Sequence, residues 1–545
     1  MYSKTTIVQG YNLPKNLPFK DIVIVGSGAS GSACAWKLSS SGASVVLLEQ
    51  GPWFDKNSYP GDSNSWEIDQ KNSFDFNPNV RKLDADYEIL DKESDIHPLM
   101  YNAVGGSTHH WTAHTPRFHP SDFKVKSLDG VADDWPISYW DLEKYYDLND
   151  EMMGCSGING DPANPPRSPR QMPPLPLGPD GERIAKAADK LGWHWWPSDS
   201  YQASKDYKGR VGWNNHGTFA SKKKWQSIAS TDHTYIKPAM DNGLEVRANC
   251  AVQEITVDSS GKLRGLLYVD NKGIQYFQEA GKVILACNGI GTPRLLLNSK
   301  SKAFPDGLAN SSGLVGKNLM YHPYAAVSGV FDDNEINYSL GPLANIIIVQ
   351  EFYETDKSRD FVRGYSFQMN RSHGPGHTAL GAGGAGKIVP WGKEHHLEFK
   401  RRFKKYLGMA VISEDLPELH NRVEIDDKLK DKNGIPLPRI FYKTSQNTRN
   451  LLDHGIRSAE KLLKESGCYE TNVIPILESA GWHLMGTAKM GIDPKTSVVN
   501  SDCKTHDVDN LYIIDGSVFT TSGAVNPTTT IQAVALRAAD KILES

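Results

Sequence analysis

The sequence predicts an α/β fold in which a mainly parallel sheet covered by helices is joined to an antiparallel sheet. Three observations predict this class. Continuous apolar runs, typical of strands buried on both faces, recur at 22–25, 283–286 and 511–514. Segments that alternate between apolar and polar residues are concentrated between the second and third runs, from 325 to 475. With 545 residues, the chain is also longer than a usual single domain.

The first apolar run leads directly into the glycine motif Gly26-x-Gly28-x-x-Gly31. Helix-forming residues follow at 33–38, and then a second apolar run at 45–48. In this arrangement Gly26 permits a tight turn, Gly28 lets the backbone approach a pyrophosphate, and Gly31 lets the helix pack on the strand. The pyrophosphate would lie at the N-terminus of the helix, where free N–H groups and the helix dipole favour an anion.

Glu49 ends the second run, where this motif places an acidic residue for a ribose hydroxyl. An isolated GxGxxG is a weak signal, but here strand, glycines, helix, strand and acid follow in order. A glycine-rich turn without a ligand is therefore the less favoured interpretation. The sequence predicts a Rossmann-like domain that binds an adenine dinucleotide.

A second glycine-rich segment lies at 105–112. It contains Gly105-Gly106-Ser107, followed by two histidines and Trp111. Small residues in such a run suit close approach of the backbone to a flat or anionic ligand.

Near its middle, the chain returns to the nucleotide-binding sheet. The segments 244–257 and 265–269 predict strands, and 282–286 predicts a further buried strand. Thr292 as N-cap, with Pro293 at the first helical position, predicts the start of the next helix. The nucleotide-binding domain is therefore expected to be discontinuous in sequence.

The remaining segments complete both parts. Ala344–Val349 predicts an antiparallel strand, and apolar residues at helical spacing predict a helix over 448–465. Towards the C-terminus, His483 lies among glycines and small residues, and a buried strand ends at Asp515-Gly516. Asn526-Pro527 then precedes a helix whose positive N-terminal end would face a cleft.

These segments divide the chain into five parts. The nucleotide-binding domain is expected to comprise 15–110, 240–330 and 480–545. A substrate-side elaboration, or cap, is expected at 111–239, and the substrate-binding domain at 331–479.

Composition excludes several classes of protein. A formal net charge of −4 gives no reason to expect nucleic acid or an anionic membrane as partner. The six cysteines are widely spaced, so no metal site, iron–sulfur cluster or disulfide framework is expected. No apolar run approaches the roughly 18–20 residues of a membrane span. Residues 1–20 carry no secretion signal, so a cytoplasmic location is expected, with export alongside a partner as the alternative.

Taken in order, the motifs resemble the glucose–methanol–choline (GMC) oxidoreductases, a family of FAD-dependent enzymes that oxidise alcohols. The resemblance covers nearly the whole chain. It implies a Rossmann-like FAD-binding domain, of the type also seen in p-hydroxybenzoate hydroxylase, with an antiparallel-sheet substrate domain. The stretches that carry it are Gly26–Gly31 with Glu49, Gly105–Ser107, Ala286–Leu297, His483–Thr487, and Asp515–Gly516 with Asn526–Pro527.

The resemblance implies that FAD contacts residues from all three parts of its domain. These residues are Gly26, Gly28, Ser30, Gly31, Glu49, Gly105, Gly106, Ser107, His110, Val252, Asp515, Gly516, Asn526, Pro527 and Thr528. His110-Trp111-Thr112 also matches the position of the flavin-linked histidine in the pyranose oxidase branch. A covalent bond between the flavin and His110 is therefore a hypothesis.

Within the family, the chain looks most like the branch of pyranose oxidase and of gluconate and fructose dehydrogenases. The family's usual His-Pro is His483-Leu484 here, and its second catalytic position, histidine in many members, is Asn526. These features favour a sugar, glycoside or polyol, oxidised to a ketone or lactone, over a simple alcohol or choline.

The expected reaction needs a hydride acceptor, the flavin, and a group that takes the hydroxyl proton. His483 is the candidate base, because histidine titrates near neutral pH. Asn526 can hydrogen-bond the substrate oxygen without competing for the proton. An isolated histidine would more often be a core residue, but the combined motifs favour the catalytic role.

Several alternatives stay open. The chain could be a dehydrogenase subunit that passes electrons to a small partner subunit, a cytochrome or a quinone rather than to oxygen. A catalytically silent flavin-binding protein is disfavoured by the intact His483 and Asn526. A nicotinamide dehydrogenase would share the first motif but would have no use for the C-terminal half. Assembly with a small partner subunit or into a homo-oligomer, and the identity of the sugar, are also open.

Overall fold

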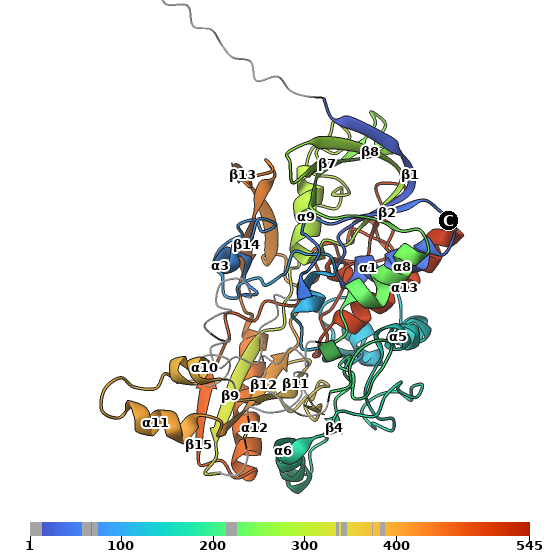
Figure 1. The fold of residues 1–545 in the computed structure, drawn as a ribbon. Coiled ribbons are helices and arrows are strands. Elements are labelled where there is room, and N and C mark those ends of the chain that lie inside the picture. The colour runs from blue at the N-terminus through green and yellow to red at the C-terminus, as the bar shows by residue number, and fades with distance from the viewer. Residues whose placement is uncertain are drawn as a thin grey trace, which may run out of the picture.

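The structure is a computed structural model that describes residues 13–56, 67, 75–213, 226–333, 337–338, 346–372, 374–381 and 387–545. In these ranges the strands form three sheets, of seven, six and three strands. In Figure 1 the seven-stranded sheet occupies the upper part of the view and the six-stranded sheet the lower part.

The seven-stranded sheet is built from three separate stretches of the chain. Its order is β5-β2-β1-β8-β7-β6, and β16 also pairs with β8. Val23 on β1 lies beside Val283 on β8, which in turn lies beside Leu511 on β16. The three apolar runs thus lie side by side in one sheet, and the predicted fold class is confirmed. The strands are β1 (Lys15–Val25), β2 (Val45–Leu48), β5 (Glu245–Arg247), β6 (Cys250–Val257), β7 (Leu263–Asp270), β8 (Gln275–Leu285) and β16 (Leu511–Ile513).

The pairings of β1 with β2 and β8, of β2 with β5 and of β8 with β16 are parallel. The pairings of β7 with β8 and with β6 are antiparallel. Helices α1 (Ala29–Ser39), α13 (Thr528–Glu544) and α5 (Tyr139–Met153) pack on one another in that order. α1, α13 and α8 (Lys237–Asp241) lie together to one side of the sheet in Figure 1. The N- and C-terminal segments therefore share one helical layer.

The six-stranded sheet is antiparallel at every pairing, in the order β15-β9-β12-β11-β10-β4. Helix α12 (Gln446–Glu465), predicted from its apolar spacing, packs on this sheet, and α6 (Gly178–Leu191) packs on α12. Of the expected strand Ala344–Val349, residues 344–345 lie outside the described residues. The strands are β4 (Trp196–Pro197), β9 (Tyr324–Val330), β10 (Ile347–Val349), β11 (Tyr365–Arg371), β12 (Tyr406–Ser413) and β15 (Glu470–Ile474).

Two of these strands come from outside the segment 331–479 expected for the substrate-binding domain. β9 falls in the segment 240–330 assigned to nucleotide binding, and β4 falls in the segment 111–239. The proposed limits of the five parts otherwise stay a prediction. The third sheet, in the order β13-β14-β3, joins β13 (Arg422–Lys430) and β14 (Pro436–Tyr442) to β3 (Leu90–Ser94).

Short helical segments connect these layers. They are α3 (Pro78–Arg81), η2 (Gly106–His109), η3 (Pro120–Phe123), α4 (Val125–Asp129), η4 (Asp232–Ile236), α10 (Pro375–Leu380), α11 (His395–Arg402) and η5 (Gly516–Val518). None of the helices in the described ranges is both long and apolar enough to cross a membrane.

The helix after β8 begins earlier than the sequence predicts. The predicted start was Thr292 with Pro293, but α9 spans Asn288–Asn298 and contains Pro293 in its interior. Because proline has no backbone N–H, the carbonyl of Gly289, four residues earlier, lacks its helical donor. The Thr487 hydroxyl donates to that carbonyl at 2.8 Å. A side chain from a distant segment therefore satisfies the helix where the proline interrupts it.

Candidate active site

One cavity of about 930 Å³ is lined by both large sheets. Its wall contains most of the residues that the family resemblance assigns to FAD, together with the two candidate catalytic residues. Gly31 and Gly105 are the two assigned residues that do not line it. Those that do are Gly26, Gly28, Ser30, Glu49, Gly106, Ser107, His110, Val252, His483, Asp515, Gly516, Asn526, Pro527 and Thr528.

The glycines of the first motif have different physical roles. A Cβ on Gly26 would lie 2.4 Å from the carbonyl oxygen of Ala286, and one on Gly31 would lie 1.9 Å from that of Gly26. These two glycines therefore permit close packing of the turn and of α1 against the sheet. A Cβ on Gly28 would meet no protein atom within 4 Å, although Gly28 lines the cavity. The space beside Gly28 is available to a ligand.

Gly28 is also the N-cap residue of α1, and the first turn of that helix contains no acidic residue. The backbone N–H groups of such a helix start favour an anion. Gly106, at φ +57, packs so closely that a Cβ there would lie 2.8 Å from Gly28 Cα. Open space, free amides and a glycine-lined wall fit the pyrophosphate of an FAD.

Glu49 is fixed at the end of β2 by three donors. Its carboxylate accepts hydrogen bonds from the Ser27 backbone N–H at 3.0 Å, the Ser27 hydroxyl at 2.7 Å and the Gly51 N–H at 2.9 Å. Burial raises the pKa of Glu49 above its ordinary value. The carboxylate is therefore held in one orientation in the cavity wall, where it fits the ribose of the dinucleotide.

Asp515 ties the end of β16 to α9. It accepts from the Thr292 hydroxyl at 2.6 Å, the Asn288 N–H at 3.1 Å and the Ser517 N–H at 2.9 Å. Thr292, expected to cap a helix, thus supports this carboxylate instead. The bonds hold Gly516 in the cavity wall.

His483 is buried at the wall, with its Nδ1 2.8 Å from Nδ1 of His322. The far nitrogen of His322, Nε2, lies 2.8 Å from the carbonyl oxygen of Gly523 and 3.1 Å from that of Ser522. Burial, and then the neighbouring His322 and His114, hold the pKa of His483 well below its ordinary value. His483 is therefore neutral near neutral pH.

Asn526 is oriented by two side chains that donate hydrogen bonds to its side-chain oxygen. Its side-chain oxygen accepts from the Gln368 amide and lies 3.1 Å from Nδ1 of His114. Burial lowers the pKa of His114 to about 4, so its Nδ1 is the donor of a neutral ring. With the oxygen engaged twice, the Asn526 NH₂ group is the part left to serve as a donor in the cavity.

His322, His114 and Gln368 were missed by sequence reasoning. None of the three lies in one of the motifs described above, and each reaches the site only in the folded chain. His322 precedes Pro323 just before β9, and this dipeptide is a local signal that would have drawn attention to it.

His110 lines the cavity and packs against aromatic rings. Its ring centroid lies 4.0 Å from that of Tyr101, 5.5 Å from Phe76 and 5.6 Å from Phe54. Burial, and then the charges of His109 and Arg81, hold the pKa of His110 well below its ordinary value. A neutral imidazole at this point is a nucleophile of the kind that covalent attachment would require.

The wall near His483 mixes apolar and amide groups. Tyr324, Ala326 and Trp482 supply apolar surface, and Gln368 and Asn370 supply amides. The described residues contain no group of three or more His, Cys, Asp or Glu side chains that could hold a metal ion. The wall therefore offers both apolar contacts and hydrogen-bonding groups to a bound molecule.

Comparison with known proteins supports the same interpretation. Two models described as GMC oxidoreductase match residues 130–324 and 417–535, and a NAD(P)-binding Rossmann-like domain matches residues 24–86. The solved structure of pyridoxine 4-oxidase from Mesorbium loti is similar in fold, with a TM-score of 0.67 at 16% identity, over 96% of this chain and 99% of that one.

Two curated relatives are similar over their whole length. The chain is 39% identical to 2-methyl-1,2-propanediol dehydrogenase from Mycolicibacterium austroafricanum, over 96% of this chain and 95% of the relative. It is 30% identical to the fructose dehydrogenase large subunit from Gluconobacter japonicus, over 96% and 97%. Since the motifs, the two-sheet fold and these full-length matches all agree, the chain belongs to the GMC oxidoreductases, flavoproteins that oxidise alcohols at a CH–OH group.

Proposed function

We propose that the protein oxidises one CH–OH group of a small polyol or sugar, with His483 as the base and Asn526 as the group that orients the alcohol. The observation that carries this proposal is the pairing of complementary polar groups in one wall. A neutral histidine and an amide whose oxygen is already engaged both line the cavity that begins at the nucleotide motif.

Bound FAD would supply the hydride acceptor. His483 takes the proton of the substrate hydroxyl as the C–H bond breaks. The Asn526 N–H donates to the same oxygen and directs it, and it cannot take the proton because an amide nitrogen has no free lone pair. The N-terminus of α13, beginning at Thr528 in the cavity wall, contributes a positive end that favours negative charge nearby.

The polyol or sugar class rests on three kinds of support. His483-Leu484 and Asn526 follow the pattern of the sugar-oxidising branch. The segment 105–112, in which His110-Trp111 follows two glycines, does so too. One full-length relative is named for a 1,2-diol and the other for fructose, both of which carry adjacent hydroxyl groups. Gln368 and Asn370 in the wall can hydrogen-bond a second hydroxyl. We therefore expect a ketone or lactone where a secondary or anomeric hydroxyl is oxidised, and an aldehyde where a terminal hydroxyl of a 1,2-diol is oxidised.

A substrate panel tests this class. Purified flavoprotein should be reduced by 1,2-diols, linear polyols or sugars, and much more slowly by monohydric alcohols of matched size and by choline. Equal rates with diols and matched monohydric alcohols would contradict the proposal. Each substrate is run with oxygen and with a dye as acceptor, so that one experiment addresses both substrate and acceptor.

The second candidate is a dehydrogenase subunit that works with a partner. The observation that favours it is that one full-length relative is itself named a large subunit. This version predicts turnover with dyes or quinones and little with oxygen. Rapid turnover with oxygen alone would favour an oxidase instead.

We also propose that the flavin is bound covalently through His110. The proposal rests on the match of His110-Trp111-Thr112 to the flavin-linked position of the pyranose oxidase branch and on the place of His110 in the cavity wall. Acid precipitation provides the test. Yellow colour retained in the pellet of the wild type, and lost from that of His110→Ala, is the expected result. Colour wholly in the wild-type supernatant would rule out the bond.

A further inference from the structure

Among the hydrogen bonds of the described residues, His322 is the one side chain bonded to Nδ1 of His483. It is buried and bridges two groups: Nδ1 of His483 on one side, at 2.8 Å, and the carbonyl oxygens of Ser522 and Gly523 on the other. The two imidazole planes are nearly perpendicular, at 86°. Each ring nitrogen of His322 therefore has an assigned partner.

The positions of the protons follow from these partners. A carbonyl oxygen can only accept, so Nε2 of His322 carries a proton. Burial lowers the pKa of His322 to about 4, so the ring is neutral and its Nδ1 has a free lone pair. That lone pair can only accept, so Nδ1 of His483 must carry the proton that lies between the two rings. In a neutral His483, the other nitrogen, Nε2, is then unprotonated.

We infer that His322 is a positioning residue that fixes the tautomer of His483, so that its Nε2 is the proton acceptor. This inference rests on the proposed function of His483 as the base. During the reaction the hydroxyl proton of the substrate moves to Nε2, and His483 becomes an imidazolium whose Nδ1–H is still bonded to His322. The neighbour that orients the base is a neutral imidazole and not a carboxylate, so it does not raise the basicity of His483 by opposite charge.

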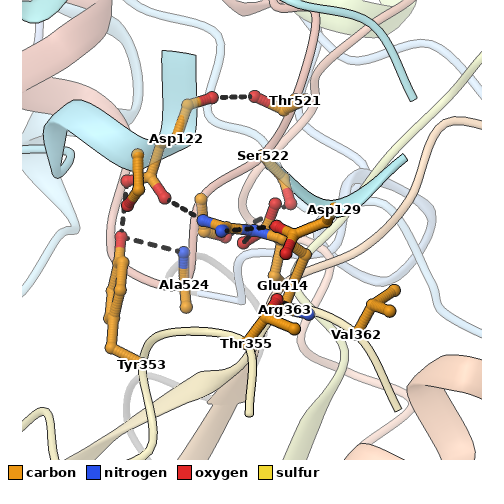
Figure 2. Close-up of polar contacts among 12 residues, drawn as sticks. Asp122, Asp129, Tyr353, Thr355, Val362, Arg363, Glu414, Thr521, Ser522 and Ala524 are labelled. Carbon is orange, nitrogen blue, oxygen red and sulfur yellow. Dashed lines mark hydrogen bonds and ion pairs between the residues drawn. The ribbon is translucent and has the colours of Figure 1, made fainter. Parts of the chain in front are cut away.

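The carbonyls that fix His322 are held by a buried polar cluster (Figure 2). Tyr353 donates to Asp122 at 2.7 Å and accepts from the Ala524 N–H at 3.2 Å, and the Thr521 hydroxyl donates to the Asp122 carbonyl at 2.7 Å. Ser522 donates to the carbonyl of Asp415 at 2.9 Å. Segment 521–524 is thus anchored on both sides of the two carbonyls.

Arg363 is the centre of this cluster. Its guanidinium lies 2.6 Å from Asp122, 2.9 Å from Glu414 and 3.1 Å from Asp129, and its side chain is 1% exposed. The carboxylates come from η3, α4 and the residue after β12, so Arg363 ties these two short helices to the six-stranded sheet. The orientation of the two carbonyls, and with it the tautomer of both histidines, is therefore set by buried groups that are hydrogen-bonded or ion-paired to one another.

The first test reads the tautomer directly. In ¹⁵N-histidine-labelled protein at neutral pH, the His483 signals are identified by their absence from His483→Ala. The expected result is a protonated Nδ1 and an unprotonated Nε2. A protonated Nε2 would overturn the inference, whatever the activity of the enzyme.

The second test uses two substitutions of His322. His322→Leu cannot accept from His483, so it should keep its flavin and its substrate affinity but slow anaerobic flavin reduction about 10- to 100-fold, part of the 10²–10⁴ that a base contributes. His322→Gln can accept through its oxygen and donate to the carbonyls through its NH₂ group, so it should recover most of the rate. His454→Gln, at a half-buried histidine that contacts Tyr365, is the matched control.

The outcomes separate this inference from the proposed function. If His483→Ala is slow but His322→Leu reduces its flavin at the wild-type rate, the inference is wrong and the base assignment stands. If His483→Ala itself is near normal, the proposed base is wrong. If His322→Leu does not retain flavin, His322→Gln and the tautomer measurement still decide, because a slow His322→Gln with full flavin content contradicts the inference.

Discussion

At the level of single residues, the proposed catalytic pair of His483 and Asn526 gives the most direct prediction. His483→Ala should retain FAD, because no residue of the glycine motifs is changed, but substrate should reduce its flavin about 10²–10⁴ times more slowly. Asn526→Ala should slow the same step about 10²-fold, the usual loss for one preorganised donor. Anaerobic stopped-flow reduction measures both. A His483→Ala protein with full flavin content and a near-normal rate would show that the base lies elsewhere.

The pH dependence of that step follows from the lowered pKa of His483. The base must be unprotonated, and burial with the neighbouring His322 and His114 keeps its pKa well below the ordinary 6.5. The reduction rate constant should therefore be flat from neutral to alkaline pH and fall only when the pH drops below that lowered pKa. Tyr324, the other titratable group against His483, stays neutral because burial raises its pKa above the ordinary value. A clear inflection near pH 6.5 would contradict this expectation.

At the level of elements, two glycines at the start of α1 have different roles: Gly28 leaves space for a ligand, and Gly31 permits close packing. Gly28→Ala adds a methyl group where no protein atom lies within 4 Å, and its φ of −69° suits alanine. The flavin-free protein should change in stability by less than about 1 kcal/mol, while FAD affinity falls about 10-fold or more, equivalent to about 1.4 kcal/mol. Equilibrium flavin titration and denaturant unfolding measure the two effects.

Gly31→Ala is the matched comparison, three residues along the same helix. Its Cβ would lie 1.9 Å from the Gly26 carbonyl oxygen, so the turn must move. We expect the flavin-free protein to lose about 1–3 kcal/mol, the usual cost of overpacking. Equal stability of the two alanine variants would show that α1 does not depend on close packing at this position.

The interrupted helix α9 gives a second prediction at this scale. Thr487→Val keeps the shape of the side chain but leaves the Gly289 carbonyl without its donor, at a cost of about 1–3 kcal/mol. Adding Pro293→Ala restores a backbone N–H four residues after Gly289, so the same Thr487→Val change should cost less in that background. Denaturant unfolding of the four proteins of this cycle is the measurement. An unchanged cost would mean that the hydroxyl does not compensate for the proline.

At the scale of the whole molecule, the cluster around Arg363 joins distant segments: η3 and α4, the six-stranded sheet at the end of β12, and, through Thr521, the segment after η5. Arg363→Met leaves Asp122 and Glu414 buried without their cation, so we expect a loss of about 3–5 kcal/mol. Arg439 makes an equally short ion pair, 2.6 Å from Asp426, but its side chain is 41% exposed. Arg439→Met should therefore cost far less stability than Arg363→Met, because solvent screens the exposed pair. Similar losses in the free energy of unfolding of the two variants would show that burial does not make the Arg363 cluster more important for stability than an exposed ion pair.

Much of the fold could be predicted because its signals are local. The run from Ile22 to Val25 and its counterparts near 283 and 511 are apolar on both faces, and that pattern alone indicates parallel strands. α12 was predicted because its apolar residues recur at the helical period. The expected limit at 330 put β9 on the nucleotide-binding side, although the alternating pattern begins at 325, because a short strand does not encode which sheet it joins. The start of α9 was missed because Thr487, which compensates for Pro293, is far away in the sequence.

The nucleotide motif, the family and the two proposed catalytic residues, His483 and Asn526, can be read from the sequence alone. Each of these is written in a short contiguous stretch, where turn geometry and helix starts require particular residues. What orients these two side chains is visible only in the folded protein. His322 is 161 residues from His483, and His114 is 412 residues from Asn526. Hydrogen bonds across such separations depend on how the sheets pack, and no local pattern of residues records that packing.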